Sequence, residues 1–327
     1  MIITKTPYRI SFFGGGSDYP SWYKKFGGSV LSTTIDKYIY ISCRELPPFF
    51  DHKYRIVWSK IENVKKINEI KHVTVRKLIK YNKVRSGLEI HYDGDLPARS
   101  GMGSSSSFSV GLMCALNFHQ RRDIKGINLA YKTIIFEQKI MKEIVGSQDQ
   151  VSASVGGFNK INFLKNDKIL IKKILSNNLE KLNSNLLLLY TGIQRNADAI
   201  AKNYVHKLSN EKEKNVRKII SNVELGEKMI KSGNIDDFGK LLHDAWIEKK
   251  ELSKSITSHK IDELYKISIQ NGALGGKLLG AGGGGFLLVY MAKEKQKSFL
   301  NKIKNITNIP FNFSNKGCEV ILNSLKK

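Results

Sequence analysis

The chain has 327 residues, 41% of them hydrophobic, which is enough for one large core or, as we expect, for two domains. Its net charge is +25, but the lysines are scattered and no basic run is interleaved with aromatic residues, so we favour a generally lysine-rich composition over a nucleic-acid-binding surface. No apolar run approaches the roughly 20 residues of a membrane-spanning helix.

The first half of the chain is predicted to mix strands with helices. β-Branched and aromatic residues favour strands, and apolar residues at helical spacing favour helices. Strands are predicted at residues 1–45 (around a glycine turn), 54–59, 87–92, 156–164 and 184–192. Helices are predicted at residues 60–82, 105–119 and 126–145.

The second half is predicted to be mainly helical before it returns to strands. Helices are predicted at residues 197–208, 211–232, 235–254, 258–271 and 293–305, and strands at 286–292 and 317–323. The polar segment 165–183 is predicted to separate two domains, residues 1–170 and 171–327. This order of elements indicates the α+β class.

Glycines crowd at three places in the chain: residues 14–16, 101–103 and 272–285. Two generic nucleotide-binding motifs fail there. "GALGGK" is one residue too short for a Walker loop and is followed by Leu278 instead of Ser or Thr. Gly280, Gly282 and Gly285 match GxGxxG, but they lead into a predicted strand, whereas the dinucleotide fingerprint follows a strand and opens a helix.

The stretch "SGMGSSSS" before a predicted helix suits a phosphate group. Small residues let backbone N–H groups approach an anion, and a helix N-terminus adds partial positive charge. The serine hydroxyls can also bind a metal ion carried by phosphates. Each glycine cluster alone is compatible with a tight turn or a packed loop, but three together, one of them serine-rich, predict a phosphate site.

The three clusters together resemble the motifs of the GHMP kinases. The first motif is "TPYRISFFGGGSDY", the second is "LPARSGMGSSSSFSV" and the third is "KLLGAGGGGFLLV", and they follow in the family's order from Pro7 to Val289. The resemblance implies an α+β, two-domain fold with an N-terminal ribosomal-protein-S5-like domain and a C-terminal ferredoxin-like α/β domain. It also implies an ATP-dependent phosphotransferase with an alcohol acceptor and Mg²⁺ as cofactor.

Within that family, the first motif, "FGGSVLSTTIDKYIYI" and "GSQDQ" look most like sugar 1-kinases, above all the D-glycero-D-manno-heptose 7-phosphate kinases. This resemblance implies phosphorylation of the anomeric hydroxyl of a sugar phosphate to a 1,7-bisphosphate, for nucleotide-activated heptose and surface glycan synthesis. A free sugar such as fucose or mannose, or a mevalonate-type substrate, is an alternative. A catalytically inactive relative is another alternative, although the intact Asp149, Arg9 and serine loop argue against it.

The resemblance also implies the catalytic groups. Asp149 in "GSQDQ" matches the catalytic base of galactokinase, and Arg9 occupies the place of the basic residue beside it. Ser105 and Glu137 match the magnesium ligands of mevalonate kinase, with the alternative that Glu137 only pairs with a surface lysine such as Lys139 or Lys142. The residues implied to wrap the triphosphate of ATP are Gly101, Met102, Gly103, Ser104, Ser105, Ser106 and Ser107.

The substrate is implied to bind between the first and third motifs. Asp18 matches the galactokinase residue that binds sugar hydroxyls, and the first motif has Gly15 and Gly16 where galactokinase has an acidic residue and a histidine. The other residues implied to contact substrate are Ser17, Gly282, Gly283, Arg99 and Arg195, and Lys277 begins the third motif. Arg99 stands where many members carry glycine, so it meets an anionic substrate or points to solvent.

The turn "QRNADAI" is predicted to bind the far phosphate of the substrate. Asn196 is a candidate N-cap, and Arg195 stands just before the predicted helix, although it can instead pair with a neighbouring acid. The expected partners are therefore ATP and a sugar phosphate, with no nucleic acid and no membrane. We expect a cytoplasmic protein, because the N-terminus lacks a basic region followed by an apolar segment and the three separated cysteines fit a reducing compartment.

Overall fold

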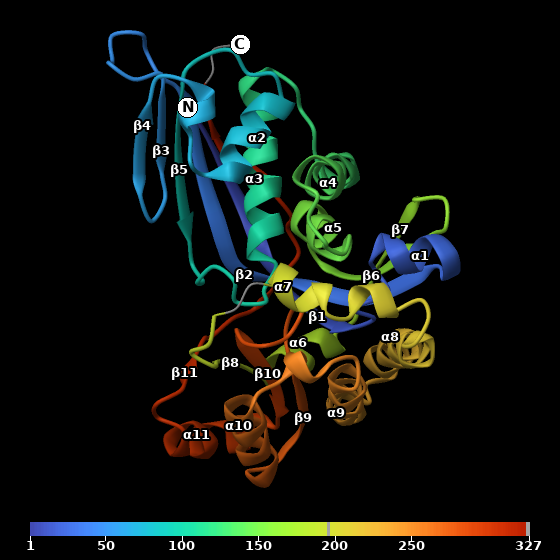
Figure 1. The fold of residues 1–327 in the computed structure, drawn as a ribbon. Helices are drawn as coiled ribbons and strands as arrows, with labels where there is room; N and C mark the ends of the chain where they lie inside the picture. The colour runs from blue at the N-terminus through green and yellow to red at the C-terminus, as the bar shows by residue number, and fades with distance from the viewer. Residues whose placement is uncertain (195–196, 325–327) are drawn as a thin grey trace.

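The computed structural model describes residues 1–194 and 197–324, which form two β-sheets with helices packed on them (Figure 1). The larger sheet has the strand order β13-β1-β2-β5-β3-β4, with β12 and β6 also paired to β2 and β7 paired to β6. Its strands are β1 (Ile2–Phe13), β2 (Gly28–Glu45), β3 (Tyr54–Val57), β4 (Ile61–Val64), β5 (Leu88–Gly94), β6 (Phe158–Phe163), β7 (Ile169–Lys173), β12 (Phe313–Ser314) and β13 (Glu319–Asn323).

The smaller sheet has the order β11-β8-β10-β9 and is antiparallel throughout. Its strands are β8 (Leu186–Tyr190), β9 (Ala273–Leu278), β10 (Phe286–Met291) and β11 (Thr307–Asn308). The mixed sheets and helices agree with the expected α+β class.

Helices cover the larger sheet on one side, as Figure 1 shows for α2 to α5. The helices of the first half are α1 (Pro20–Phe26), η1 (Ile67–Glu69), α2 (Val73–Tyr81), α3 (Ser104–His119), α4 (Gly126–Ile135), the π-helix η2 (Phe136–Met141), α5 (Gln148–Val155) and α6 (Asn178–Ser184). The helix α3 is buried on almost every side, because it packs against β1, β2 and α5.

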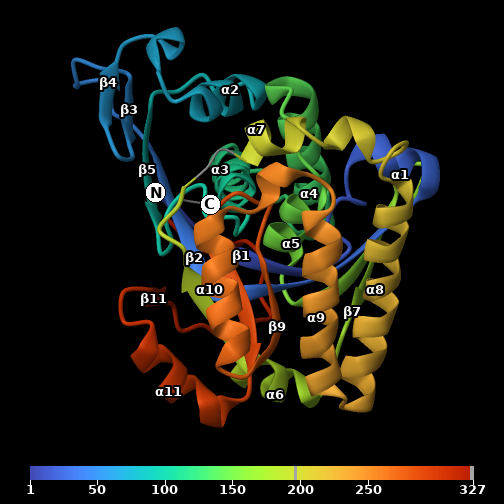
Figure 2. The same cartoon turned by 60° about the horizontal axis from the view of Figure 1, so that its bottom comes forward.

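The helices of the second half divide between the sheets: α9 and α10 pack on the smaller sheet, whereas α8 packs on α9 and on β1 and β2 of the larger sheet, and Figure 2 shows α9 between α8 and α10. They are α7 (Ala197–Lys202), η3 (Val205–Lys207), α8 (Glu213–Ser232), α9 (Ile235–Lys250), η4 (Lys254–Ile256), α10 (His259–Gln270) and α11 (Lys293–Lys302). None of the described helices is both long and apolar enough to cross a membrane.

Aromatic side chains join the two halves beside the first motif. Phe12 on β1 stacks on Phe158 with ring centroids 5.3 Å apart and meets the edge of Phe238 on α9, also at 5.3 Å. Phe13 meets the same Phe238 ring at 5.0 Å. The end of β1 is thereby packed against the helix that carries part of the site wall.

Two helix predictions in the first half need correction. Residues 60–82 are not helical throughout, because β4 forms a hairpin with β3 before α2 begins at Val73. Glu62 on β4 is buried and accepts hydrogen bonds from Trp58 Nε1 and His72 N, which holds the hairpin against the start of α2. The predicted helix 126–145 ends at Met141, where Lys142 takes a left-handed conformation with φ 60°.

The polar segment 165–183 contains ordered elements, β7 and α6, where the sequence indicated a domain boundary. The strand β7 pairs with β6 in the larger sheet, and it spans the expected division between residues 170 and 171. The last strand, β13, also returns to the larger sheet and pairs with β1. The division into residues 1–170 and 171–327 stays a prediction.

The glycine cluster 272–285 includes a strand, β9, that sequence reasoning missed. Its glycines are needed because α9 lies directly on the strand. A Cβ at Gly275 would stand 2.1 Å from Gly239 O of α9, and one at Gly276 would stand 2.4 Å from Leu288 O of β10. Glycine usually weakens strand propensity, but here close helix packing requires it.

Candidate functional site

A cleft of about 430 Å³ lies where the three glycine-rich motifs meet. The predicted residues that line it come from each motif: Arg9, Gly15, Gly16, Asp18, Arg99, Gly101, Gly103, Ser104, Ser105, Ser106, Asp149 and Gly282. A second cavity of about 460 Å³ lies beside α1 and α4, but none of the predicted site residues that the structure describes lines it. The chemistry of the first cleft therefore defines the candidate site.

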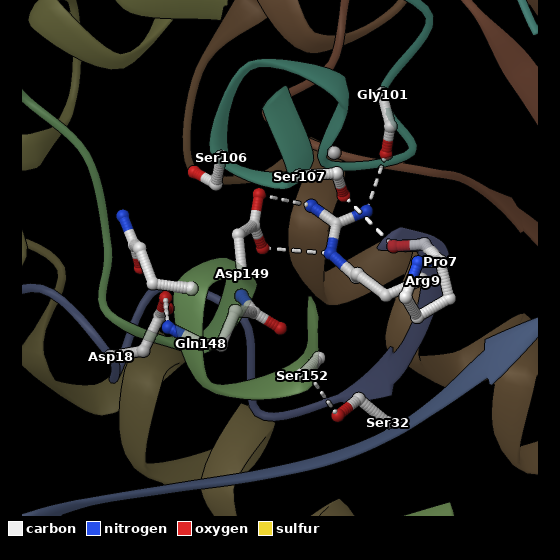
Figure 3. Close-up of polar contacts among 12 residues, drawn as sticks. Pro7, Arg9, Asp18, Ser32, Gly101, Ser106, Ser107, Gln148, Asp149 and Ser152 are labelled. Atoms are coloured by element: carbon white, nitrogen blue, oxygen red, sulfur yellow. Dashed lines mark hydrogen bonds and ion pairs between the residues drawn. The ribbon is translucent and has the colours of Figure 1, made fainter. Parts of the chain in front are cut away.

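Arg9 and Asp149 form the centre of the cleft (Figure 3). Arg9 Nε donates to Asp149 Oδ1 at 2.7 Å and Nη2 donates to Oδ2 at 2.8 Å, while Nη1 donates to Gly101 O at 2.7 Å. The arginine side chain is 4% exposed and the aspartate is 24% exposed. A bidentate, charge-assisted pair fixes a carboxylate in orientation, so Asp149 faces the cleft in one defined position.

The second motif turns sharply into α3 at Gly103, whose φ is 76°. The helix opens with Ser104, Ser105 and Ser106, which line the cleft. The first N–H groups of a helix lack intrahelical partners and carry partial positive charge, so this end is suited to an anion.

Met102 and Ser107 of the second motif do not line the cleft. Met102 is fully buried, although its carbonyl accepts a hydrogen bond from Arg9 N at 3.1 Å. Ser107 is buried, and its hydroxyl donates to Pro7 O at 2.9 Å. Both residues hold the second motif against β1, and this contact positions the serines that lie between them in the chain.

The second and third motifs pack backbone against backbone, which explains several glycines. A Cβ at Gly101 would stand 2.5 Å from Leu279 O, and one at Gly285 would stand 2.1 Å from Ser100 O. Phe286 N donates to the same Ser100 carbonyl at 3.2 Å. These glycines make room for a neighbouring loop. At Gly103, by contrast, a Cβ would stand 3.3 Å from both Arg9 Cγ and Asp149 Oδ2, inside the site itself.

Asp18 lies in a buried position at the first motif. Its carboxylate accepts hydrogen bonds from Gly16 N at 3.1 Å and from Gln148 N at 3.3 Å. Burial, and then the nearby charge of Asp149, raise the pKa of Asp18 to about 6. The two carboxylates thus lie close enough to interact, and Gln148 connects the loops that carry them.

The other first-motif residues divide between the cleft and the turn itself. Gly15 and Gly16 line the cleft, and the space around the Cβ direction of Gly16 is open. Ser17 is not among the lining residues: its hydroxyl donates to Gly14 O at 2.8 Å and Ser29 O at 2.9 Å, so it closes the turn onto β2. In the third motif, Gly282 lines the cleft, whereas Gly283 N donates to Ile256 O at 2.8 Å.

Glu137 is buried at the start of the π-helix, 1% exposed, and reaches the opening turn of α3. Its Oε2 accepts hydrogen bonds from Ser106 Oγ at 2.9 Å and from Gln150 Nε2. Burial raises the pKa of Glu137 to about 7, against the effect of nearby hydroxyl and amide groups. The surface pairing with Lys139 or Lys142 is not observed. Ser106 donates to Glu137 and Ser109 also interacts with its carboxylate, whereas the predicted metal ligand Ser105 is exposed at the cleft.

Of the two arginines predicted to bind phosphate, only Arg99 is among the described residues. Arg99 is exposed, lines the cleft and has a left-handed backbone with φ 60°. Arg195 and Asn196 lie outside the described residues. The described groups of the second half that line the cleft include two lysines, Lys249 and Lys277.

Sequence reasoning missed Lys249 and Gln148 as cleft residues. Lys249 sits on α9 within an ordinary run of charged residues, so no local pattern marks it. Gln148 directly precedes Asp149, and its side-chain Oε1 is buried without a hydrogen bond to any described residue. Its backbone N–H is bonded to Asp18, and it directly precedes Asp149 in the chain. The second of these facts is the sequence signal that could have identified it as a cleft residue.

Comparison with known proteins identifies relatives of this arrangement. Two family models match the chain, the GHMP kinases N terminal domain over residues 68–157 and the GHMP kinases C terminal domain over residues 227–306. A D-glycero-alpha-D-manno-heptose 7-phosphate kinase of Campylobacter jejuni is 28% identical over 93% of each chain. A galactokinase of Pyrococcus furiosus is 25% identical over 91% of each. The solved structure of a D-glycero-D-manno-heptose 1-phosphate kinase from Bacteroides thetaiotaomicron shares the fold, with a TM-score of 0.81, 20% identity and coverage of 99% of this chain and 100% of that chain.

Proposed function

The chain belongs to the GHMP kinases, and we propose that it transfers the γ-phosphoryl group of ATP to the anomeric hydroxyl of a sugar phosphate. The observation that carries the proposal is the Arg9–Asp149 pair at the meeting point of the three glycine-rich motifs. Phosphoryl transfer requires positioning and charge neutralisation more than covalent chemistry by the protein, and this cleft offers groups for both.

The nucleotide triphosphate is assigned to the start of α3. Gly103, Ser104 and Ser105 present backbone N–H groups and hydroxyls to the cleft at the positive end of a 16-residue helix. Arg9 braces this loop because it also donates to Gly101 O. This contact holds the loop in place without requiring a bound phosphate.

Asp149 is assigned the role of general base. As the anomeric oxygen forms its bond to the γ-phosphorus, the hydroxyl proton passes to Asp149, the bond from the γ-phosphorus to the bridging oxygen breaks, and ADP leaves. Each carboxylate oxygen has two lone pairs, so the hydrogen bonds from Arg9 leave acceptor capacity for the substrate hydroxyl. Asp18, at the first motif, is assigned to accept hydrogen bonds from other sugar hydroxyls.

The residues near α3 also fit Mg²⁺. Glu137 Oε1 is buried and accepts no hydrogen bond of normal geometry from a described residue, while Oε2 is bonded to the Ser106 hydroxyl. Carboxylate and hydroxyl oxygens suit this ion, so Glu137 with Ser105 or Ser106 would hold it. When bound with ATP, Mg²⁺ supplies neutralisation of the phosphate charge. Among the described residues there is no cluster of three or more histidine, cysteine or acidic side chains that would hold a metal without the nucleotide.

For the substrate we propose D-glycero-D-manno-heptose 7-phosphate, with the 1,7-bisphosphate as product, by analogy with the Campylobacter relative. The product would then supply nucleotide-activated heptose for surface glycans. A sugar that ends in a phosphate needs cationic groups away from the transfer centre, and Arg99 at the cleft and Arg195 remain the sequence-based candidates.

The experiment is an assay with ATP and Mg²⁺ against matched acceptors. Heptose 7-phosphate, free heptose, fucose, galactose, mannose and mevalonate are compared by kcat/KM, and phosphorus NMR locates the new phosphate on the product. The proposal expects transfer to C1 of the sugar 7-phosphate with the highest kcat/KM. Equal or better phosphorylation of a free sugar, or transfer to mevalonate, would exclude the sugar-phosphate assignment and retain only the kinase.

A further inference from the structure

Two lysines from the second half of the chain line the cleft beside the first motif, Lys277 in a buried position and Lys249 in a half-buried one. Lys277 on β9 is 6% exposed, and its Nζ donates to Phe12 O at 2.5 Å, two residues before the glycine run begins at Gly14. Lys249 on α9 donates from Nζ to Leu278 O at 2.8 Å and to Gly280 O at 2.6 Å. Within the described part of the chain, neither ammonium group pairs with a carboxylate.

No ion pair among the described residues neutralises the two lysines of this wall. Arg9 is neutralised by Asp149. Two further carboxylates, Asp18 and Glu143, line the cleft, and Asp18 is bonded to backbone N–H groups of its own side. Burial and then neighbouring positive charge lower the pKa of Lys277 to about 7 and that of Lys249 well below its usual value. A buried ammonium without a counterion is unfavourable, so both amines lose a proton more readily than usual. An anion entering the cleft would favour their charged ammonium forms and would be held by them.

The hydrogen-bonding capacity of the lysines also favours an anionic ligand. An ammonium group has three donors. The backbone carbonyls account for two on Lys249 and one on Lys277. The unused donors belong to groups that line the cleft, and a phosphate monoester offers three acceptor oxygens and nearly two negative charges.

We propose that Lys249 and Lys277 form a subsite for the phosphate group carried by the sugar substrate. This inference rests on the proposed sugar-phosphate kinase activity and deepens it. Lys277 is tied to the end of β1, which leads into the motif that carries Asp18, the residue assigned to the sugar. The nucleotide is assigned to the serines at the start of α3, and Lys249 also lies near that loop, because it is bonded to Gly280 O and the backbone of Gly280 packs against Gly101. The phosphate of the nucleotide is the competing source of the same chemistry, and the experiment separates the two.

The test replaces each lysine by methionine, which keeps the length and apolar stem of the side chain and removes its charge. The variants are Lys249→Met and Lys277→Met, and the matched control is Lys250→Met, the next position on α9, which lies outside the cleft lining and near Asp262. For each variant, kcat/KM is measured with heptose 7-phosphate and with free heptose, and KM is measured for ATP. Thermal unfolding confirms that the variants are folded.

Each cleft variant is expected to reduce the preference for the phosphorylated over the free sugar by roughly tenfold or more, chiefly through KM for the sugar phosphate. The ATP KM is expected to stay within about twofold of wild type, and Lys250→Met is expected to behave as wild type. A purely structural role for the lysines would lower both sugar activities together and leave their ratio unchanged, which would overturn the proposal. A loss of ATP affinity with an unchanged ratio would assign the lysines to the nucleotide instead.

A binding measurement keeps the subsite testable if the proposed function fails. Inorganic phosphate is titrated by calorimetry into protein saturated with a non-hydrolysable ATP analogue and Mg²⁺, so that all three nucleotide phosphate positions are filled. We expect binding to wild type and to Lys250→Met, and binding weaker by roughly tenfold in the two cleft variants. If wild type lacks sugar-phosphate kinase activity but shows this lysine-dependent binding, only the function is wrong. If phosphate does not bind, or binds equally to all variants, the subsite is wrong.

Discussion

Arg9 on the first strand donates hydrogen bonds to both carboxylate oxygens of Asp149, which lies 140 positions away in the sequence. The Nε–Oδ1 distance is 2.7 Å and the Nη2–Oδ2 distance is 2.8 Å. The arginine is also bonded to Gly101 O, so one side chain links the first motif, the second motif and the start of α5. In the proposed reaction, the pair would fix the geometry between an acceptor hydroxyl at Asp149 and a phosphate at the start of α3.

Asp149→Asn is expected to lower kcat by about 10²- to 10⁴-fold, because the amide keeps the shape of the side chain but cannot take the hydroxyl proton. Nucleotide affinity is expected to survive, since the serine loop holds the phosphates. Steady-state kinetics and equilibrium ADP binding measure the two effects. Asp123→Asn, at an exposed aspartate paired with Lys125, is the matched control and is expected to change neither. A kcat near the wild-type value would remove Asp149 from the role of base.

Gly103→Val is expected to abolish detectable nucleotide binding. The new Cβ would stand 3.3 Å from Arg9 Cγ and Asp149 Oδ2 at a backbone φ of 76°, so the side chain would crowd the ion pair and the helix start together. Gly126→Val is the matched control, because Gly126 also has a positive φ of 55° but faces open space at the start of α4.

Both glycine variants carry a similar backbone strain of about 1–2 kcal/mol, so their thermal unfolding should shift by comparable amounts. Calorimetric titration with ADP then distinguishes an effect of backbone strain, common to both variants, from an effect on the nucleotide site, expected only for Gly103→Val. Loss of binding is expected in Gly103→Val alone. If both variants bind the nucleotide as wild type does, the second motif is a structural loop and not the phosphate cradle.

Glu137→Gln is expected to change how stability depends on pH. Burial raises the pKa of Glu137 in the folded protein from its usual 4.5 to about 7. A raised carboxyl pKa means that its contribution is fully present below the unfolded value and is lost as pH rises through the folded value. Relative to the variant, wild type should therefore lose stability between about pH 4.5 and pH 7.

Urea unfolding of both proteins across this pH range, without Mg²⁺, measures the difference. Glu211→Gln, at a largely exposed glutamate paired with Lys207, is the control and is expected to run parallel to wild type. Asp18 changes stability in the same direction in all three proteins, because its pKa is also raised, to about 6. Curves for wild type and Glu137→Gln that stay parallel would contradict the raised pKa.

Arg99→Gly tests whether the exposed arginine of the second motif meets an anionic substrate. Glycine adopts the left-handed φ of 60° without the steric cost of a side chain, so the variant should be at least as stable as wild type. If the guanidinium contacts the sugar phosphate, the preference for phosphorylated over free sugar should fall by about tenfold. Arg121→Gly, with the same φ of 60° but outside the cleft lining, is the matched control. An unchanged preference would indicate that Arg99 points to solvent and does not contact the sugar phosphate.

Much of the site could be predicted from sequence because the motifs are local. Gly101 and Gly103 both adopt positive φ angles that glycine tolerates, and the serines that follow open a helix as expected. The two long strands within residues 1–45 and the helix at 105–119 were predicted for a similar reason, since propensity and periodicity are properties of short segments. The helix α1 (Pro20–Phe26) between those strands was not predicted. The roles assigned to these residues stay predictions.

The errors arose where distant segments decide the local structure. Gly275 and Gly276 suggested a loop, but they lie in β9, where α9 packs too closely for a Cβ at Gly275 and β10 packs too closely for one at Gly276. Similarly, "IENV" was assigned to a helix, but its hairpin with β3 and the buried contacts of Glu62 make it a strand.

The sequence by itself determined the α+β class, the family and the three motifs, because glycine conformations, serine hydroxyls and helix starts depend on residues close together in the chain. Only the tertiary structure decided which side chains share the cleft. It paired Glu137 with Ser106 and not with a surface lysine, and it brought Lys249 and Lys277 to the wall beside Arg9. No short-range pattern records these placements, because they result from the packing of α9 and β9 against the end of the first strand.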